Sequence, residues 1–541
     1  MQDMRNKTED TICAIATGMG DGAIGIIRLS GPDAFSIAGQ VFRGRKRPSE
    51  MESYTAAFGR IVRPAQNDGE GEAAGESLAE KEAGENPAEK EAGESTAEPG
   101  RMRGDTEEKE EVLDETVMLV MRAPHTYTTE DTVEFQCHGG AFGLSGVLGL
   151  LVEKGARLAE PGEFTRRAFL GGRIDMSQAE AVMDVIRAEN DVFYRASQDQ
   201  LGGLLRKRVT EMRDKLLTET ARIESALDDP EHYDLTGYPE ELAGILRQLL
   251  TELAGMLRRS SEGIRLRDGI PTVIAGLPNV GKSSLMNALL GTDRAIVTPE
   301  EGTTRDTLTE TIRLGNLTLR LTDTAGIRKT DSRAEEAGIL RSYSSMEEAE
   351  LVLLVLDASR QLLPEEAGLV RRAGMEKTII LLNKEDVPDA RGREEMAEEL
   401  KTLLENTESS AWDAESADGN IESADKAAES PQGIRLPEIL EISAREGTGL
   451  EPLRKKVEER FLREGFSGSR EPMITSVRHK EALLRTMDAL ERVMKGIEEG
   501  LPEDFLTIDL MDAYQSLGRI TGETLEDDLA DKIFAEFCMG K

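Results

Sequence analysis

Short apolar runs alternate with helix-like segments over residues 270–464. The runs fall at 271–275, 317–322, 351–356, 378–382 and 438–442. Most of them are rich in Val, Ile and Leu without strict alternation, which is typical of strands buried on both faces. The order of strands and helices predicts a mainly parallel sheet with helices on both sides.

Residues 10–170 show shorter apolar runs that are broken by glycine. Val133 and Phe135 alternate with Glu134, as in a strand with one buried face. A turn leads into an expected helix from Ala34, and a second helix is expected over 141–153. Arg28 interrupts an apolar strand, and the usual explanation is an edge-strand residue that faces solvent. This region is predicted to be an α+β domain.

Helical spacing of apolar residues dominates two separated segments, 177–227 and 475–499. Ser177 and Glu180 fit a capping box at the start of the first segment. Neither segment forms a complete bundle alone. We therefore expect the two segments to pack together, with the α/β domain inserted between them.

These patterns predict a multidomain α/β protein. The expected parts are an N-terminal α+β domain at 1–170, a first helical segment at 171–265, the inserted α/β domain at 266–465 and a second helical segment at 466–541. Two acidic stretches, about 65–111 and 405–432, are too poor in apolar residues to bury a core. We expect both to be disordered insertions.

The formal net charge of −37 argues against a generally basic nucleic-acid binder. Much of this charge lies in the two acidic stretches, so a local basic patch can still bind RNA. Cys13, Cys137 and Cys538 do not make a disulfide framework, which suggests a reducing compartment. The N-terminus does not resemble a signal peptide, and no apolar run is long enough to span a membrane. We expect a cytoplasmic protein without membrane contact.

A phosphate-binding pattern runs from Gly276 to Ser283. It follows a strand-like run and precedes a helix-like run, the context that a P-loop requires. The residues expected to contact nucleotide are Asn279, Val280, Gly281, Lys282, Ser283 and Ser284. Lys282 would reach the β- and γ-phosphates, and the Ser283 hydroxyl would bind Mg²⁺.

Four further motifs follow in the order typical of a Ras-like G domain. Thr304, in a Gly-Thr-Thr-Arg-Asp segment, would complete Mg²⁺ coordination. Asp323 would hold Mg²⁺ through water, and the Gly326 N–H would sense the γ-phosphate. Thr324 and Ala325 lie between these two residues in the sequence, and we also count them among the GTP contacts.

The remaining two motifs concern the base. Asn383, Lys384 and Asp386 form an Asn-Lys-Glu-Asp motif, in which the Asp386 carboxylate can accept hydrogen bonds from guanine N1–H and N2–H₂. Adenine lacks those donors and would leave the carboxylate unpaired. A closing segment over the base is expected from Ser443, Ala444 and Arg445. The nucleotide is therefore predicted to be GTP.

One position departs from Ras-like proteins, because Ile327 stands where they carry the glutamine that orients the attacking water. Hydrolysis therefore needs another source of charge neutralisation and another water-positioning group. Asn279 can help to hold a monovalent cation, and Glu335 can reach a water if its helix moves. The alternative for Glu335 is a solvated helix face.

With these motifs in view, the whole chain resembles the bacterial tRNA modification GTPase family MnmE, also called TrmE. Besides the G motifs, the resemblance rests on segments 10–12, 25–32, 161–168, 172–181 and the C-terminal Phe-Cys-Met-Gly-Lys. It implies an N-terminal folate-binding domain that dimerises, a discontinuous helical domain and an inserted G domain. It also implies a homodimer that forms a heterotetramer with an FAD-dependent partner, MnmG.

The activity that the resemblance implies is K⁺-stimulated GTP hydrolysis. With the partner, it supports 5-carboxymethylaminomethyl or aminomethyl modification of the wobble uridine of tRNA. The implied cofactors are GTP, Mg²⁺, K⁺ and a tetrahydrofolate one-carbon derivative, 5-formyl- or 5,10-methylene-tetrahydrofolate.

The resemblance also implies roles for single residues. Its folate-contacting positions are Arg28, Glu134, Arg173 and Lys541; its K⁺ site is Asn279, Thr298, Glu300 and Thr303. Thr298 and Thr303 also count among the GTP contacts. The water-orienting position falls on Glu335, which with Lys282 makes up the predicted catalytic set.

Two other residues have open interpretations. His138, before two glycines, is a catalytic base or, as we favour, a structural hydrogen-bonding residue. Cys538 matches a cysteine of the family, but no base accompanies it and we expect no catalytic thiol.

Two other functions fit parts of the pattern. A ribosome-assembly GTPase would share the G motifs, but it would bind no folate and would carry a basic RNA-binding module. A stand-alone folate one-carbon transferase with a regulatory G domain would need an acid–base or nucleophile set that we do not find.

Overall fold

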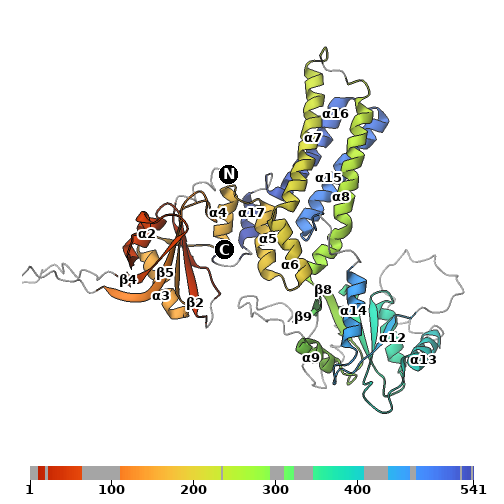
Figure 1. Cartoon of the computed structure of the whole chain (residues 1–541). Helices are drawn as coiled ribbons and strands as arrows, with labels where there is room; N and C mark the ends of the chain where they lie inside the picture. The colour runs from red at the N-terminus through yellow and green to blue at the C-terminus, as the bar shows by residue number, and fades with distance from the viewer. Residues whose placement is uncertain are drawn as a thin grey trace, which may run out of the picture. The chain divides into compact units, whose positions relative to one another are not determined.

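The computed structural model describes residues 10–18, 22–63, 110–232, 235–292, 310–321, 345–406, 436–462, 471–523, 527–535, 537 and 540 (Figure 1). The chain forms two compact units, and each is considered separately. The first unit combines Met1–Ile174 with Glu526–Lys541, and the second is Asp175–Leu525. The C-terminal residues thus group with the N-terminal ones, whereas the division at 170, 265 and 465 stays a prediction.

The first unit is built on one mixed sheet with the strand order β3-β4-β5-β6-β2-β1-β7 (Figure 1). The strands are β1 (Ile12–Ile15), β2 (Ile24–Ser30), β3 (Phe42–Gly44), β4 (Thr55–Arg63), β5 (Glu111–Met121), β6 (Thr132–His138) and β7 (Arg157–Leu158). Only β1 and β7 pair in parallel within this sheet. Helices α2 (Ala34–Val41) and α3 (Ala141–Glu153) share a core with one face of the sheet, as the sequence predicts.

Residues of opposite character alternate along the two central strands. Ile27, Leu29 and Phe135 are fully buried in the core with α2 and α3. Arg28 and Glu134 point to the other face, directly opposite each other in the β2–β6 register. Because β2 lies between β6 and β1, the interpretation of Arg28 as an edge-strand residue is wrong.

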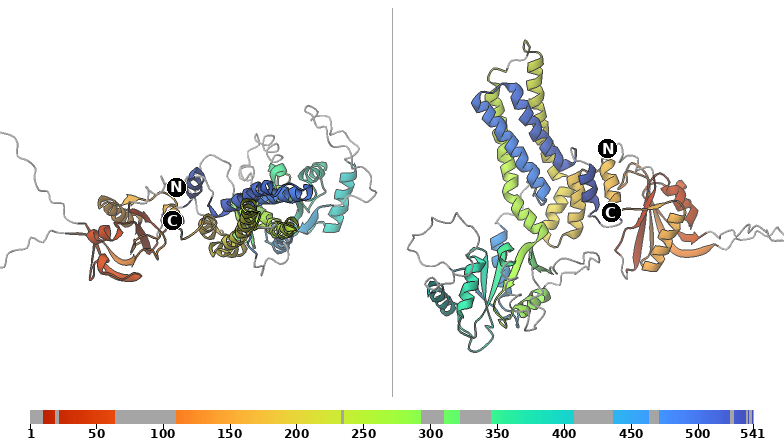
Figure 2. Two further views of the ribbon diagram at one scale, coloured as in Figure 1. Left: turned by 90° about the horizontal axis from the view of Figure 1, so that it is seen from above. Right: turned by 180° about the vertical axis from the view of Figure 1, so that it is seen from behind.

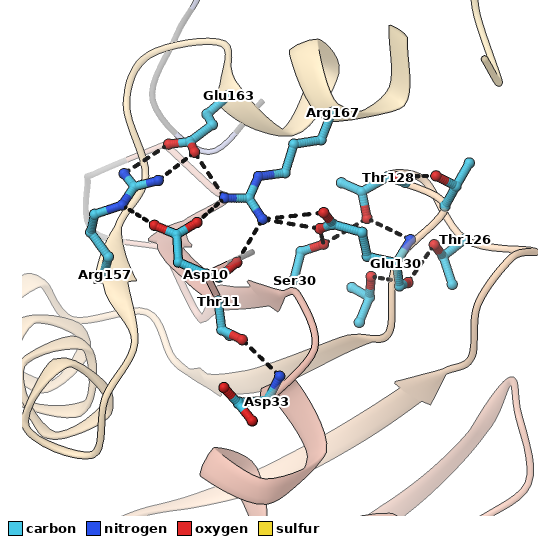
Figure 3. A network of polar contacts seen from close by, with 12 residues as sticks. Asp10, Thr11, Ser30, Asp33, Thr126, Thr128, Glu130, Arg157, Glu163 and Arg167 are labelled. Atoms are coloured by element: carbon cyan, nitrogen blue, oxygen red, sulfur yellow. Dashed lines mark hydrogen bonds and ion pairs between the residues drawn. The ribbon is translucent and has the colours of Figure 1, made fainter. Parts of the chain in front are cut away.

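A polar network holds the rest of this unit together (Figure 3). It centres on Arg167 of helix α4 (Glu163–Leu170), whose side chain is 2% exposed. Arg167 donates to Asp10 Oδ1 at 2.6 Å, to Glu163 Oε1 at 3.0 Å and to Glu130 Oε1 at 3.2 Å. Arg157 binds both oxygens of Glu163 and Asp10 Oδ2. The loop before β6, the strand β1 and α4 are therefore fixed to one another.

The network lowers the pKa of two of its carboxylates, Glu163 and Asp10. Burial raises the pKa of Glu163, but the Arg157 and Arg167 guanidiniums and a backbone N–H outweigh it, so the net pKa is lowered. The same opposition lowers the pKa of Asp10. At the other end of the chain, helix α17 (Asp527–Ala535) packs on α4, with the Phe534 and Phe169 rings 6.1 Å apart.

Helices also form the part of the second unit that lies away from its sheet (Figure 2). They are α5 (Met176–Arg187), α6 (Asp191–Leu201), α7 (Leu204–Asp228), α8 (Tyr238–Asp268), α15 (Val477–Glu499) and α16 (Glu503–Thr521). Leu216, Leu253, Leu490 and Leu517 belong to one buried cluster that all four long helices share. The prediction that the two helical segments pack together is confirmed.

The start of α5 corrects one local prediction. Asp175, not Ser177, is the N-cap, and its carboxylate accepts the Gln178 N–H at 2.8 Å. Gln178 completes the capping box, and the Ser177 hydroxyl donates to Asp175. The Ser177–Glu180 capping box is therefore wrong by two residues, because Asp caps a helix as well as Ser does.

The remaining part of the second unit is the predicted α/β sheet, with the order β13-β12-β11-β8-β10-β9. Its strands are β8 (Ile270–Ala275), β9 (Glu310–Leu314), β10 (Leu317–Leu321), β11 (Leu351–Asp357), β12 (Thr378–Asn383) and β13 (Glu438–Glu441). All pairs are parallel except β9 with β10, and β9 was not predicted.

Helices cover both faces of this sheet. Leu353 and Val355 share a core with α9 (Lys282–Thr292) and α14 (Leu450–Phe461), whereas Val352 and Leu354 share one with α12 (Pro364–Ala373) and α13 (Arg393–Asn406). The continuous apolar run of β11 thus reflects burial on both sides. Among the helices that the structure describes, none is both long and apolar enough to cross a membrane.

Arg167→Met should destabilise the first unit by about 3 kcal/mol, because it removes the buried cation that Asp10, Glu130 and Glu163 share. Thermal unfolding followed by circular dichroism measures this. The matched control is Arg43→Met, which removes an exposed arginine paired with Glu110 in the same unit and should cost less than about 1 kcal/mol. Equal melting temperatures for both variants would contradict the role given to Arg167.

Candidate nucleotide-binding site and a second polar site

The loop between β8 and α9 has the geometry of a phosphate cradle. β8 ends at Ala275 and α9 begins at Lys282, so the loop's backbone leads directly into a helix N-terminus. Asn279 has a φ of 65° and Gly281 a φ of 103°. A Cβ on Gly281 would lie 2.0 Å from Asn383 Nδ2, so only glycine fits there.

Lys282 lies within this loop. Its Nζ donates to the Gly276 carbonyl at 2.7 Å and to the Leu277 carbonyl at 2.8 Å. Burial lowers the pKa of Lys282 from its usual range. Ser283 and Ser284 follow in the first turn of α9, where backbone N–H groups have no intrahelical acceptor.

Asn383, at the end of β12, connects the phosphate loop to the predicted base-closing segment. Its side chain is buried, with 3% of the residue exposed. Nδ2 donates to the Val280 carbonyl at 2.8 Å, and Oδ1 accepts the Ala444 N–H at 2.9 Å. One amide thus brings together segments that are far apart in the sequence.

Asp386, which the sequence predicts to read guanine, is also held by the 443–445 segment. Ser443 Oγ donates to Asp386 Oδ1 at 2.6 Å and also accepts the Glu446 N–H at 3.2 Å. A pocket of about 440 Å³ lies beside α9 and is lined by Ser284, Asn287, Ala288, Ala444, Arg445, Glu446, Gly447 and Leu450. Every described residue of the predicted GTP set therefore lies at one end of the parallel sheet.

Many predicted site residues lie outside the described part of the chain. They are Thr298, Glu300, Thr303, Thr304, Asp323, Thr324, Ala325, Gly326, Ile327, Glu335, Cys538 and Lys541. Ser283 of the Mg²⁺ set and Asn279 of the K⁺ set are described. Within the described ranges, no group of three or more His, Cys, Asp or Glu side chains is placed to hold a metal.

A second polar site lies on the face of the first unit's sheet opposite α2 and α3. Arg28 Nε donates to Glu134 Oε1 at 2.7 Å, and its guanidinium lies 5.6 Å from the Phe164 ring centre. The Tyr127 ring lies under two guanidiniums, those of Arg28 at 5.7 Å and Arg173 at 4.9 Å. Two of the four predicted folate positions, Arg28 and Arg173, therefore lie at one tyrosine, and a third, Glu134, binds Arg28.

Comparison with known proteins now bears on both sites. A model described as the MnmE helical domain matches residues 176–538, and one described as the GTP-binding protein TrmE N-terminus matches residues 11–78 and 70–173. The tRNA modification GTPase MnmE of Lachnoclostridium phytofermentans is 39% identical over 98% of this chain and 99% of its own length. The tRNA modification GTPase MnmE of Moorella thermoacetica is 40% identical over 98% of this chain and 100% of its own length.

The chain belongs to the tRNA modification GTPase MnmE family. Among solved structures, a variant of Aquifex aeolicus Era bound to GDP.AlF4- is 26% identical over 40% of this chain and 65% of its own, with a TM-score of 0.22.

Sequence reasoning missed residues at both sites of this MnmE family member. Asp357, the last residue of β11, accepts Lys384 Nζ at 2.6 Å. Its signal was an acidic residue at the end of a buried parallel strand, where ligands bind in such folds. Tyr127 and Phe164 were also missed, because aromatic residues in a loop and a helix carry no distinctive spacing.

His138 has the partner that the sequence did not reveal. Its Nδ1 lies 2.5 Å from Asp114 Oδ1 on β5, and its backbone N–H donates to the other carboxylate oxygen. The hydrogen bond to the Asp114 carboxylate raises the pKa of His138, whose side chain is 78% exposed. This favours a hydrogen-bonding role at the strand end, the preferred of the two interpretations.

Asp386→Asn should weaken GTP binding by about 100-fold, because an amide cannot accept both guanine donors and charged hydrogen bonds contribute about 1.5–3 kcal/mol. Displacement of a fluorescent guanine nucleotide measures the affinity. The control is Asp389→Asn, which removes an exposed carboxylate three residues further along the chain. An Asp386→Asn protein that still prefers GTP over other purine nucleotides would contradict the base-recognition assignment.

Proposed function

We propose that this chain hydrolyses GTP in the course of tRNA wobble-uridine modification. The observation that carries the proposal is the arrangement around Asn383, which joins the phosphate loop to the segment that holds Asp386. Membership of the MnmE family supports the tRNA substrate. A ribosome-assembly GTPase is the second candidate, and the match of the TrmE N-terminal model argues against it.

The phosphate loop supplies the binding energy for the triphosphate. The first N–H groups of α9 and the loop's backbone would face the β-phosphate, and Lys282 would exchange its two carbonyl partners for phosphate oxygens. Ser283, with Thr304, would hold Mg²⁺. The ion would supply positive charge where negative charge develops on the phosphate oxygens. The Ser283 hydroxyl fits this role, since Ser283 follows Lys282 in the first turn of α9.

Base recognition follows from Asp386. Its carboxylate already accepts the Ser443 hydroxyl on Oδ1, which fixes its rotamer. Each carboxylate oxygen has two lone pairs, so guanine N1–H and N2–H₂ can still bind. The Ala444 N–H, oriented by Asn383, places the backbone of 443–445 where it can close over the base.

The hydrolytic step needs groups that Ras-like proteins do not use. Ile327 cannot orient water, so we assign this role to Glu335. Asn279, Thr298, Glu300 and Thr303 would hold K⁺ in place of an arginine finger. The backbone of the phosphate loop turns sharply at Asn279, whose φ is left-handed, and this conformation is compatible with a role in holding K⁺.

The second polar site fits a tetrahydrofolate one-carbon derivative, the 5-formyl or 5,10-methylene form. Arg28 and Arg173 lie over Tyr127, and Arg28 also binds Glu134. A pterin presents donors and acceptors that suit a carboxylate and a guanidinium. Arg173 is exposed and has no carboxylate partner among the described residues, so it suits a glutamate tail. Lys541, the fourth position of this proposed site, lies outside the described residues.

The wider reaction requires other molecules. We assign tRNA as the substrate, a homodimer as the working form and an FAD-dependent partner, MnmG, in a heterotetramer in the cytoplasm. The flavoprotein would supply the redox chemistry, since Cys13 and Cys137 are buried and burial raises the pKa of each thiol to about 11.

GTP turnover of the whole chain should be at least about tenfold faster in K⁺ than in Na⁺ at equal ionic strength, because the cation takes the part of an arginine finger. Glu335→Ala should lower turnover in K⁺ by about 100-fold without changing GDP affinity. Equal rates in both salts would remove the cation from the mechanism. Undiminished GTP turnover of Glu335→Ala would show that Glu335 has no part in hydrolysis.

Binding of 5-formyl-tetrahydrofolate, measured by calorimetry, should weaken by about 10- to 100-fold in Arg173→Met, because a charged hydrogen bond to the ligand is lost. Arg43→Met, at an exposed site in the same unit, is the control and should bind as the wild type does. Absence of saturable binding to the wild type would contradict the folate assignment.

A further inference from the structure

Lys384 has an unusual backbone. It follows β12, between Asn383 and the guanine-reading Asp386, and its φ is 74°. L side chains rarely adopt this left-handed conformation, because Cβ approaches the carbonyl oxygen. Such a residue persists only where its surroundings fix it. The direction in which the chain leaves Lys384 also sets where Asp386 lies.

Asp357 supplies a fixed partner for Lys384. The two residues are neighbours because β11 and β12 are parallel, with Asp357 opposite Asn383 in the register. Asp357 Oδ2 accepts Lys384 Nζ at 2.6 Å, and only 9% of the Asp357 side chain is exposed. A pair this well shielded is screened less by solvent and salt than a surface pair.

The rest of the Asp357 carboxylate is held as well. Its Oδ1 accepts the Ser359 N–H at 3.0 Å and the Ser359 hydroxyl at 2.6 Å. Arg360 Nε lies 4.0 Å from Oδ2, too far for a hydrogen bond, and the Arg360 guanidinium binds Glu366 instead. Burial alone would raise the pKa of Asp357, but the bonds from Lys384 and Ser359 outweigh it and lower the pKa. The carboxylate is therefore ionised and immobile near neutral pH, and its second oxygen faces Lys384.

We propose that Asp357 is a positioning residue for guanine-nucleotide binding: its ion pair with Lys384 stabilises the left-handed turn that presents Asp386 to the base. This inference rests on the proposed GTP site and extends it by one residue, which would not itself touch the nucleotide. Because the γ-phosphate is bound elsewhere in the site, Asp357 should affect GDP and GTP alike.

The test is the dissociation rate of mant-GDP from the whole chain by stopped flow. In Asp357→Asn, the amide has one acceptor oxygen for two sets of donors, so either Lys384 or Ser359 loses its partner. We expect release about tenfold faster, equivalent to about 1.4 kcal/mol. The dissociation rate of mant-GTP should increase by the same factor. The control Asp389→Asn, an exposed carboxylate on the same loop, should release nucleotide at the wild-type rate.

A double-mutant cycle separates positioning from general stability. Lys384→Met keeps the length of the side chain but removes its charge. If Asp357 acts through Lys384, adding Asp357→Asn to Lys384→Met should change the rate by less than about twofold. Ser359→Ala, which removes one bond to Asp357 and leaves the ion pair, should speed release by a smaller factor that also disappears in the Lys384→Met background.

The outcomes are distinct. Unchanged or slower release from Asp357→Asn, or an effect of Asp357→Asn that is independent of Lys384, overturns the proposal. If Asp357→Asn does not fold, the release rates of Ser359→Ala alone and combined with Lys384→Met test the proposal in the same way. Failure of the wild type to bind mant-GDP would instead overturn the GTP assignment itself.

Discussion

The two hydrogen bonds of the buried Asn383 amide are the constraint on which the nucleotide site depends. The phosphate loop and the 443–445 segment come from distant parts of the sequence, and each loop alone has many conformations. A buried amide that is unpaired costs free energy, so the structure keeps both its donor and its acceptor satisfied. Satisfying one side chain therefore sets the spacing between the phosphate-binding and base-binding halves of the site.

A parallel sheet makes this arrangement possible. Because all its strands except β9 run in one direction, the ends of β8, β11 and β12 meet at one edge. The phosphate loop follows the first, Asp357 ends the second and Asn383 ends the third. Apolar side chains cover both faces of the sheet, so polar groups concentrate where the strands stop. The site is a consequence of how the core is built.

The sequence predicted the features that depend on short spacing. The strand positions, the phosphate loop and the Asn383–Asp386 motif each have a local signature. In the structure, the loop and the motif lie at the same edge of the sheet. It failed where a contact joins distant segments or where two residues suit one role. Arg28 was misjudged because its partner Glu134 lies 106 residues away. Ser177 was chosen over Asp175, since both cap helices equally well. Asp357 escaped notice because its partner lies on the next strand.

The first unit uses charge in two different ways, and this difference bears on function. Arg157 and Arg167 share the carboxylates of Asp10 and Glu163, so these four charged groups are paired with one another and stabilise the unit. Nearby, Arg28 has one carboxylate and Arg173 none among the described residues. Guanidiniums stacked on Tyr127 keep N–H groups at their edges, because a cation–π contact uses only the face of the group. A ligand with carboxylates therefore has donors available at the second polar site that the Arg167 network does not provide.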